Sequence, residues 1–332
     1  PCQICHKRKS FMPLKKRILG KTNISVADVG LGLWAVSGSE WGTTADRETF
    51  AAIDKALEMG VNFFDTADVY GNGHSEELLG QAMKGRREKF IVSTKIGWIG
   101  YDGQKSQYTT VDKFIAGVES NLKRLQTDYV DVIFSHIPYA EPNLPVFLEG
   151  FEKLQKQGKI KGYGASTSDF EFLKKFNSNG LCSVLQIDYS LLNRTPEAEI
   201  LPYCQKENIG VLIRGPLAMG LLTGKLNKNS QFESSDFRRN WQNKPEENKI
   251  FLEDLEKVQR LRPLAKDKTL AQLALQFTLS HPAVSVIIPG AKRPQQVEEN
   301  VSAGLLAPLT GEELKNFEEI TPKNGGRKIW PA

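Results

Sequence analysis

The chain has 332 residues, of which 40% are hydrophobic and 25% charged, an ordinary balance for a soluble globular protein. No apolar run approaches the ~18 residues of a membrane span, and no signal peptide is recognised at the start. We therefore expect a cytoplasmic protein. The formal net charge of +5 arises at the N-terminus, because seven cations precede the first acid, Asp28, and the rest holds 37 basic against 39 acidic residues. A basic face for nucleic acid is therefore not expected.

The first eleven residues differ in character from the rest of the chain. Cys2, Cys5 and His6 have the C-x-x-C-H spacing of covalent haem attachment, but only a handful of residues separate them from Met12, too few for a haem-enclosing domain. We interpret residues 1–11 as a disordered extension or a cloning remnant, and residues 12–332 as one domain, since no Pro/Gly/Ser-rich linker divides them. Cys182 and Cys204 fall in apolar segments and are expected to be reduced core thiols.

Residues 13–28 predict a small β-hairpin with Gly20 in its turn. Eight short apolar runs come after it, separated by helix-like stretches, and this alternation predicts parallel strands. The sequence thus predicts an α/β fold, a (β/α)8 TIM barrel with an N-terminal β-hairpin. The eight runs are Val29–Gly32, Val61–Asp65, Phe90–Lys95, Val130–His136, Ile160–Gly164, Ser183–Tyr189, Gly210–Arg214 and Val284–Pro289.

Helices are expected between these strands. Arg47–Met59 has helical apolar spacing and stops at Gly60, and Thr110 is a capping residue for a helix that ends near Leu125. After the eighth strand, Gln295–Ala303 and Glu312–Ile320 have helical patterns.

The seventh unit has a long loop. About seventy residues separate Arg214 from the eighth strand, and the polar part, Leu226–Asn248, contains Asp236, Arg238, Arg239 and Trp241. Long excursions at the top of a barrel are often functional. A cofactor-covering loop and a solvated insertion both remain open.

Four ionisable residues lie at neighbouring strand ends, where barrel enzymes gather their chemistry. Asp65, Lys95 and His136 end the second, third and fourth strands, and Tyr70 follows Asp65 by five residues. A tyrosine is a poor acid at neutral pH, but a neighbouring Lys95 held by Asp65 would lower its pKa, while His136 could orient a carbonyl. A simple Asp65–Lys95 salt bridge is the structural alternative, but it leaves the other two residues unexplained.

These segments strongly resemble the aldo-keto reductase superfamily from about Met12 to Glu319. The resemblance lies in F-F-D-T-A-D-V-Y-G, S-T-K, V-D-V-I-F-S-H, G-P-L-A-M-G-L-L-T-G-K and I-P-G-A-K-R-P-Q-Q-V-E-E-N. It implies a TIM barrel and hydride transfer from a nicotinamide cofactor to a carbonyl. The implied catalytic residues are Asp65, Tyr70 as general acid, Lys95 and His136.

The resemblance also implies a cofactor site without a Rossmann glycine motif. By this resemblance, Ser166 and Gln186 would hold the carboxamide, Thr167 stands where Asn is usual, and Arg214 would stack on the nicotinamide. Lys292 and Arg293 suit a 2′-phosphate, so NADP(H) is favoured over NAD. The full expected set is Gly32, Leu33, Trp34, Asp65, Ser166, Thr167, Gln186, Arg214, Gly215, Pro216, Leu217, Gly220, Leu221, Thr223, Lys225, Gly290, Lys292, Arg293, Gln296, Glu299 and Asn300.

Loop aromatics suggest a substrate pocket. We expect it to involve Trp34, Trp98 and His136, with Trp41 and Tyr139 as further candidates. No metal is expected, because the chain has four histidines and no paired-ligand motif.

The sequence therefore predicts a cytoplasmic, NADPH-dependent oxidoreductase that reduces small aldehydes or ketones to alcohols. The alternative is a cofactor-binding regulatory subunit resembling the β subunits of potassium channels, which share this barrel. The natural substrate and the oligomeric state do not follow from the sequence.

Overall fold

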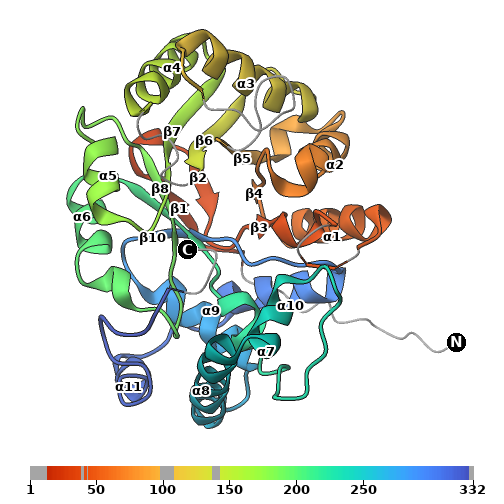
Figure 1. The fold of residues 1–332 in the computed structure, drawn as a ribbon, viewed down its shortest axis with the longest axis vertical. Helices are drawn as coiled ribbons and strands as arrows, with labels where there is room; N and C mark the ends of the chain where they lie inside the picture. Colours follow the sequence, from red (N-terminus) through yellow and green to blue (C-terminus); the bar gives the residue numbers. More distant parts are fainter. Residues whose placement is uncertain (1–12, 39–40, 43, 98–107, 137–142, 329–332) are drawn as a thin grey trace, which may run out of the picture.

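The computed structural model describes residues 13–38, 41–42, 44–97, 108–136 and 143–328 (Figure 1). The predicted hairpin is confirmed: β1 (Lys16–Ile18) pairs antiparallel with β2 (Ser25–Ala27). Gly20 begins the turn with a φ of +52°, and a Cβ there would lie 2.2 Å from the backbone N of Gly210. Only glycine allows this close approach to the barrel. The predicted boundary between residues 11 and 12 lies outside the described residues.

The predicted parallel barrel is also confirmed. The strands form one sheet in the order β10-β9-β8-β7-β6-β5-β4-β3. Bridges from Val29 to Ile287 and from Gly32 to Gly290 join the first strand to the last. The strands are β3 (Leu31–Gly32), β4 (Phe63–Asp65), β5 (Ile91–Ile96), β6 (Val130–His136), β7 (Ile160–Ser166), β8 (Val184–Asp188), β9 (Gly210–Arg214) and β10 (Val284–Ile287).

Helices surround this barrel (Figure 1). Thr110 caps α3 as predicted, by accepting a hydrogen bond from the N–H of Lys113 at 3.3 Å. The last predicted helix is shorter than expected, since only Gly311–Asn316 is helical. The α-helices are α1 (Asp46–Glu58), α2 (His74–Met83), α3 (Val111–Arg124), α4 (Leu144–Lys156), α5 (Phe170–Phe176), α6 (Ile200–Lys206), α7 (Asn240–Asn243), α8 (Pro245–Leu261), α9 (Leu270–Ser280), α10 (Pro294–Leu305) and α11 (Gly311–Asn316).

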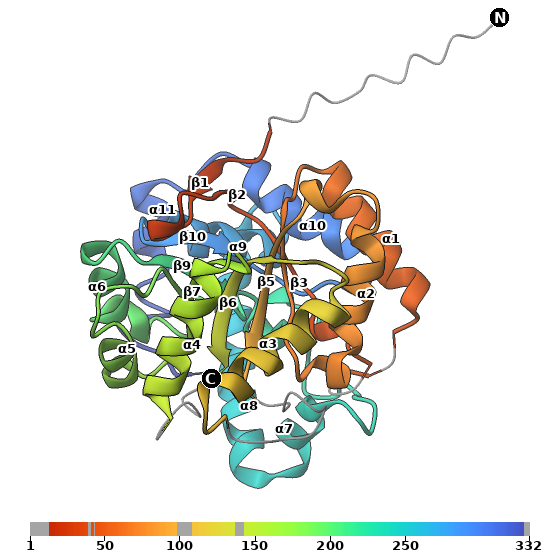
Figure 2. The ribbon, with the colours of Figure 1, turned by 90° about the horizontal axis from the view of Figure 1, so that it is seen from above.

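The excursion after β9 is largely folded. It contains α7, α8 and α9 together with three short 3₁₀ helices, η7 (Ala218–Thr223), η8 (Phe237–Arg239) and η9 (Arg262–Ala265). Figure 2 shows β1 and β2 at one end of the barrel and α7 at the other. The excursion therefore covers the end opposite the hairpin.

Strand alternation explains how the barrel interior changes from apolar to polar. Inward side chains on β4, β6, β8 and β9 include Phe63, Phe134, Val184 and Leu212, which belong to one buried cluster. Side chains two residues further along a strand point to the same face. These positions are Asp65, His136, Gln186 and Arg214. The pattern stacks a polar layer directly above the apolar core.

The two inner cysteines, Cys182 and Cys204, are buried and free, as predicted. Within the described part of the chain, no helix is both long enough and apolar enough to cross a membrane.

Candidate active site

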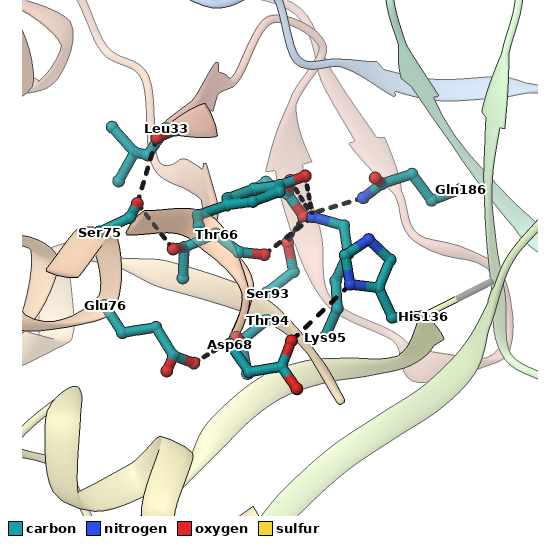
Figure 3. Close-up of polar contacts among 12 residues, drawn as sticks. Leu33, Thr66, Asp68, Ser75, Glu76, Ser93, Thr94, Lys95, His136 and Gln186 are labelled. Atoms are coloured by element: carbon teal, nitrogen blue, oxygen red, sulfur yellow. Dashed lines mark hydrogen bonds and ion pairs between the residues drawn. The ribbon is translucent and has the colours of Figure 1, made fainter. Parts of the chain in front are cut away.

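A buried lysine links two of the predicted residues at the carboxyl ends of the strands. Lys95 Nζ donates to Asp65 Oδ2 at 2.7 Å, to Tyr70 Oη at 3.0 Å and to the carbonyl oxygen of Thr66 at 2.8 Å. Lys95 is fully buried and Asp65 is 2% exposed. Figure 3 shows this cluster, with Lys95 at its centre. All three of its protons can therefore be used in hydrogen bonds.

A tight turn brings Tyr70 back over Lys95. Tyr70 begins the 3₁₀ helix η3 (Tyr70–Gly73), in which Gly71, Asn72 and Gly73 all have positive φ. A Cβ on Gly71 would lie 2.4 Å from the carbonyl oxygen of Ser37. A side chain at position 71 would therefore force apart the two loops beside the tyrosine.

The net effect on the pKa of Tyr70 differs from the sequence prediction. Burial raises this pKa, and Lys95 lowers it only in part. Burial also acts to lower the pKa of Lys95, but Asp65 and Tyr70 together raise it above its ordinary value. Lys95 thus stays charged and lowers the pKa of Tyr70, both as predicted, but burial, which the prediction left out, outweighs this effect and leaves the pKa above its ordinary value.

His136 lies beside this cluster at the end of β6. Its ring meets that of Tyr70 edge-on, with centroids 6.1 Å apart and planes at 85°. Nδ1 of His136 is 3.7 Å from Oδ1 of Asp68, a residue that the sequence prediction did not include. Burial lowers the pKa of His136, and Asp68 opposes this shift.

A second buried network supports the end of β5 from outside the barrel. Glu76 of α2 accepts hydrogen bonds from Thr94 Oγ1 at 2.5 Å and from Arg124 Nε at 2.6 Å. Asn121 donates to the carbonyl oxygen of Lys95 at 3.0 Å. Burial raises the pKa of Glu76 to about 7. Side chains from two helices therefore fix the strand that carries Lys95.

A cavity of about 790 Å³ opens above these residues. Its wall contains most of the predicted set. These residues are Gly32, Trp34, Asp65, Tyr70, His136, Ser166, Gln186, Arg214, Gly215, Pro216, Leu217, Gly220, Thr223, Lys225, Gly290, Lys292, Gln296, Glu299 and Asn300. The volume is in the range of small-molecule and cofactor sites.

Other predicted residues do not line the cavity. Lys95 lies beneath its floor, and Leu33 and Leu221 are buried behind it. Thr167 is 3% exposed, and its hydroxyl accepts from the N–H of Asp169 at 3.0 Å, at the start of α5. Arg293 faces Glu48 at 3.8 Å with a side chain that is 68% exposed. Trp98 and Tyr139 lie outside the described residues.

The wall also contains residues to which no role was assigned from sequence. Arg238 comes from the long excursion and lies 4.9 Å from the centre of the Trp41 ring, and it donates to the carbonyl oxygen of Met219 at 3.4 Å. Asp236 orients its guanidinium with contacts of 2.9 and 2.6 Å. The others are Ala35, Val69, Met219, Leu226, Ala271, Ile288, Pro289 and Ala291. Trp41, a further candidate for the substrate pocket from sequence, also lines the wall.

Stacked rings connect the excursion to the active-site floor. Trp34 stacks on both Tyr70 and Phe237, with centroid distances of 5.9 Å in both cases. Trp41 meets Trp34 and Phe237 edge-on. Leu226 and Arg238 line the cavity, and Phe237 packs on the rings of Trp34 and Trp41. The excursion is therefore packed against the site and is not merely a solvated insertion.

The two ends of the cavity differ in chemistry. At the inner end, Gln186 Nε2 donates to Asp65 Oδ1 at 2.9 Å, while its buried Oε1 has no hydrogen-bond partner among the residues that the structure describes. That oxygen is suited to an amide N–H of a ligand. At the outer end, Lys225, Arg238 and Lys292 supply positive charge. Between them, Ala218, Met219 and Gly220 have positive φ in a loop that follows β9.

Known proteins are similar to this chain over nearly its whole length. The model of the aldo/keto reductase family matches residues 28–322. The aldo-keto reductase YhdN of Bacillus subtilis is 33% identical over 91% of this chain and 90% of its own. The NADH-specific methylglyoxal reductase of Escherichia coli is 32% identical, over 87% and 93%. A probable voltage-gated potassium channel subunit beta of Arabidopsis thaliana is 32% identical, over 92% and 97%.

Solved structures give the same result. The glycerol dehydrogenase AKR11B4 of Gluconobacter oxydans has a TM-score of 0.80 and 31% identity, covering 96% of this chain and 98% of its own. An aldo-keto reductase of Klebsiella pneumoniae in complex with NADPH has a TM-score of 0.71 and 28% identity, covering 94% and 96%. By fold, by site geometry and by sequence, the chain belongs to the aldo/keto reductase family.

Proposed function

We propose that this protein is an NADPH-dependent reductase of aldehydes or ketones, with Tyr70 as the general acid. The observation that carries this proposal is the Lys95 ammonium, which bonds both Asp65 and the Tyr70 hydroxyl beneath the cavity. Its bonds to Asp65 and to the Thr66 carbonyl hold the ammonium, its third bond holds the phenol, and Tyr70 lies on the cavity wall.

The cavity wall fits a nicotinamide dinucleotide. Gln186 Oε1 would accept from the carboxamide, with Ser166 beside it, and the Arg214 guanidinium would pack against the ring. Loop residues 215–225 would lie along the pyrophosphate, since glycines there permit close backbone approach. When bound, the reduced nicotinamide supplies the hydride.

Preference for NADPH is proposed from the cations at the outer end. Lys292 lines the cavity, and burial and the charge of Arg238 lower its pKa. Cations held close together are stabilised by an anion between them, which a 2′-phosphate would provide. The relative in Escherichia coli is named as NADH-specific, so this preference needs its own test.

The chain's own residues would contribute binding and protonation. The Tyr70 hydroxyl would donate to the substrate oxygen as negative charge develops there. Lys95 would favour the phenolate that remains after the proton is transferred, and Asp65 keeps Lys95 charged. Trp34 and Trp41 would exclude water from one side of the site.

The test is a panel of aldehydes and ketones, each assayed by the loss of NADPH absorbance. Turnover of at least one carbonyl class that stops in Tyr70→Phe supports the proposal. Equal, negligible rates for the wild type and Tyr70→Phe across the panel would contradict it.

A regulatory subunit remains the second candidate, because one relative is named as a probable potassium channel subunit. The intact Asp65–Lys95–Tyr70 cluster favours catalysis over this alternative. Negligible turnover combined with stable capture of a channel protein would favour the regulatory role.

A further inference from the structure

An arginine outside the cavity connects the two elements that carry Lys95 and Tyr70. Arg124 lies at the end of α3, and its side chain is 18% exposed. Its Nε donates to Glu76 Oε2 of α2 at 2.6 Å, and its Nη2 donates to Asn121 Oδ1 at 3.1 Å. Acceptors on two helices therefore hold the planar guanidinium in one orientation.

Asn121 extends this network to the strand end that carries Lys95. Its Nδ2 donates to the carbonyl oxygen of Lys95 at 3.0 Å. The same carbonyl oxygen accepts from the N–H of Asp68 at 3.2 Å. Asp68 belongs to the segment between Asp65 and Tyr70. This segment is therefore bonded to β5 at the point where Asn121 holds the strand.

The aliphatic part of Arg124 reaches the turn that begins with Tyr70. Gly73 ends this turn, η3, with a φ of +96°, and a Cβ there would lie 2.5 Å from Arg124 Cδ. The arginine side chain thus lies directly against the Gly73 backbone. Glu76, in the first turn of α2, bonds the guanidinium and also accepts from Thr94 Oγ1 of β5 (Figure 3). The turn, α2 and β5 are therefore held together around one arginine.

We propose that Arg124 is a positioning residue that sets the separation between Lys95 and Tyr70. Through Asn121 it fixes the backbone of Lys95. Through its contact with Gly73 it fixes the turn that begins with Tyr70. The bond of 3.0 Å between Lys95 Nζ and Tyr70 Oη depends on both contacts. This inference rests on the proposed function, in which Lys95 assists proton transfer from Tyr70.

The separation matters because Lys95 lowers the pKa of Tyr70 against the effect of burial. Asp65 raises this pKa and Arg214 lowers it, while the ring of His136 meets that of Tyr70 edge-on. If Lys95 moves away from the phenol, its lowering effect weakens and the pKa of Tyr70 rises further. Tyr70 then becomes a weaker acid toward the substrate oxygen.

Arg124→Met tests the proposal, because it removes both polar contacts and keeps an unbranched apolar side chain. We expect kcat to fall by about tenfold or more, since a misplacement of about 1 Å can cost about a hundredfold. KM for the carbonyl substrate and affinity for NADPH should stay nearly unchanged, because Arg124 lies outside the cavity wall. A wild-type kcat in Arg124→Met would overturn the proposal.

A double variant separates positioning of the acid from a general structural role. In Tyr70→Phe no acid is left to position, so adding Arg124→Met should leave the residual rate nearly unchanged. The same fold-loss of kcat in the wild-type and Tyr70→Phe backgrounds would overturn the proposal, because the effect of Arg124 would then be independent of Tyr70.

The matched control is Arg87→Met, at the other end of β5. The Arg87 side chain is 19% exposed, and its Nη2 lies 3.0 Å from Oδ2 of the buried Asp131. Its Nη1 donates to the carbonyl oxygen of Phe90, just before the strand. Arg87→Met should lose stability, as Arg124→Met should, but keep the wild-type kcat. A similar fall in kcat in both variants would overturn the positioning role.

A crystal structure of Arg124→Met tests the geometry without any turnover. The distance between Lys95 Nζ and Tyr70 Oη, 3.0 Å here, should lengthen beyond hydrogen-bond range. An unchanged distance would overturn the proposal. If the wild type reduces no carbonyl compound, the proposed function is contradicted, while this structure still decides whether Arg124 sets the separation.

Asn121→Ala takes the place of Arg124→Met if that variant does not fold. It keeps the ion pair between Arg124 and Glu76 and removes the bond to the Lys95 carbonyl oxygen. We expect the same pattern, a lower kcat with nearly unchanged KM and NADPH affinity. A wild-type kcat in Asn121→Ala would overturn the proposal, because Lys95 would then not depend on this network.

Discussion

Tyr70 carries the most specific chemical assignment in this chain, and its hydroxyl can be removed without disturbing its ring. In Tyr70→Phe the stacking on Trp34 remains, but the proton donor to the substrate is lost. We expect kcat to fall by about a hundredfold or more, the usual contribution of a positioned acid, with NADPH affinity nearly unchanged. Steady-state rates and a fluorescence titration measure the two quantities.

The matched control is Tyr163→Phe, since Tyr163 is a fully buried tyrosine of β7 that does not line the cavity. It should retain wild-type turnover. More than about a tenth of wild-type turnover in Tyr70→Phe would remove Tyr70 from the role of general acid.

The catalytic role of the Lys95 charge can be tested separately from its contribution to stability. Lys95→Met removes the group that opposes the raised pKa of Tyr70, so turnover should be lost while the cofactor still binds. The change also leaves the buried Asp65 carboxylate without its cation, which costs roughly 3–5 kcal/mol of stability.

The double variant Lys95→Met/Asp65→Asn removes that unpaired charge and should regain thermal stability without regaining activity. Recovery of turnover in the double variant would make Lys95 a structural partner of Asp65 only.

At the scale of elements, α2 contains a buried carboxylate that makes stability depend on pH. The folded-state pKa of Glu76 is about 7 against an ordinary 4.5, because burial outweighs the contact with Arg124. Folding therefore favours the protonated carboxyl. The contribution of Glu76 to the free energy of unfolding is fully present below pH 4.5 and is lost as the pH rises through about 7. The total loss is roughly 3 kcal/mol.

Glu76→Gln should flatten this part of the stability profile, whatever its effect on absolute stability. Urea unfolding at pH 5 and pH 8 measures the difference, and Glu77→Gln, an exposed neighbour on the same helix, is the control. An unchanged difference between the two pH values in Glu76→Gln would show that Glu76 is not the titrating group.

The strands and their polar ends could be predicted because a single rule governs both. Side chains alternate along a strand, so the sequence that buries Phe134 also places His136 on the same face. Asp68 and Arg238 could not be placed in this way. Their positions depend on a turn after β4 and on a folded excursion, where no short period relates sequence to direction. The net rise in the pKa of Tyr70 was not predicted, because burial depends on all the segments that enclose the site and not on the neighbouring residues alone.

At the scale of the whole molecule, net charge does not explain attraction for an anionic cofactor. The excess of cations belongs to the N-terminal segment, and Lys15, Lys16, Arg17 and Lys21 lie in or beside the hairpin at the far end of the barrel from α7. The remaining chain is close to neutral. We therefore expect affinity for a phosphate to depend on the local cations Lys225, Arg238 and Lys292 on the cavity wall.

Lys292 and Arg293, the two adjacent cations after β10, should contribute unequally to the preference for NADPH over NADH. Lys292 lines the cavity, while the Arg293 side chain is 68% exposed and faces Glu48. A charge-assisted contact is worth about 1.5–3 kcal/mol, so Lys292→Ala should weaken NADPH binding by about tenfold or more and leave NADH binding almost unchanged. Arg293→Ala should have a smaller effect, and the double variant should add little to Lys292→Ala. Fluorescence titration with both cofactors measures the affinities. An equal loss of affinity for NADPH and NADH would mean that Lys292 and Arg293 support the fold or bind the pyrophosphate. That outcome would remove the basis for an NADPH preference.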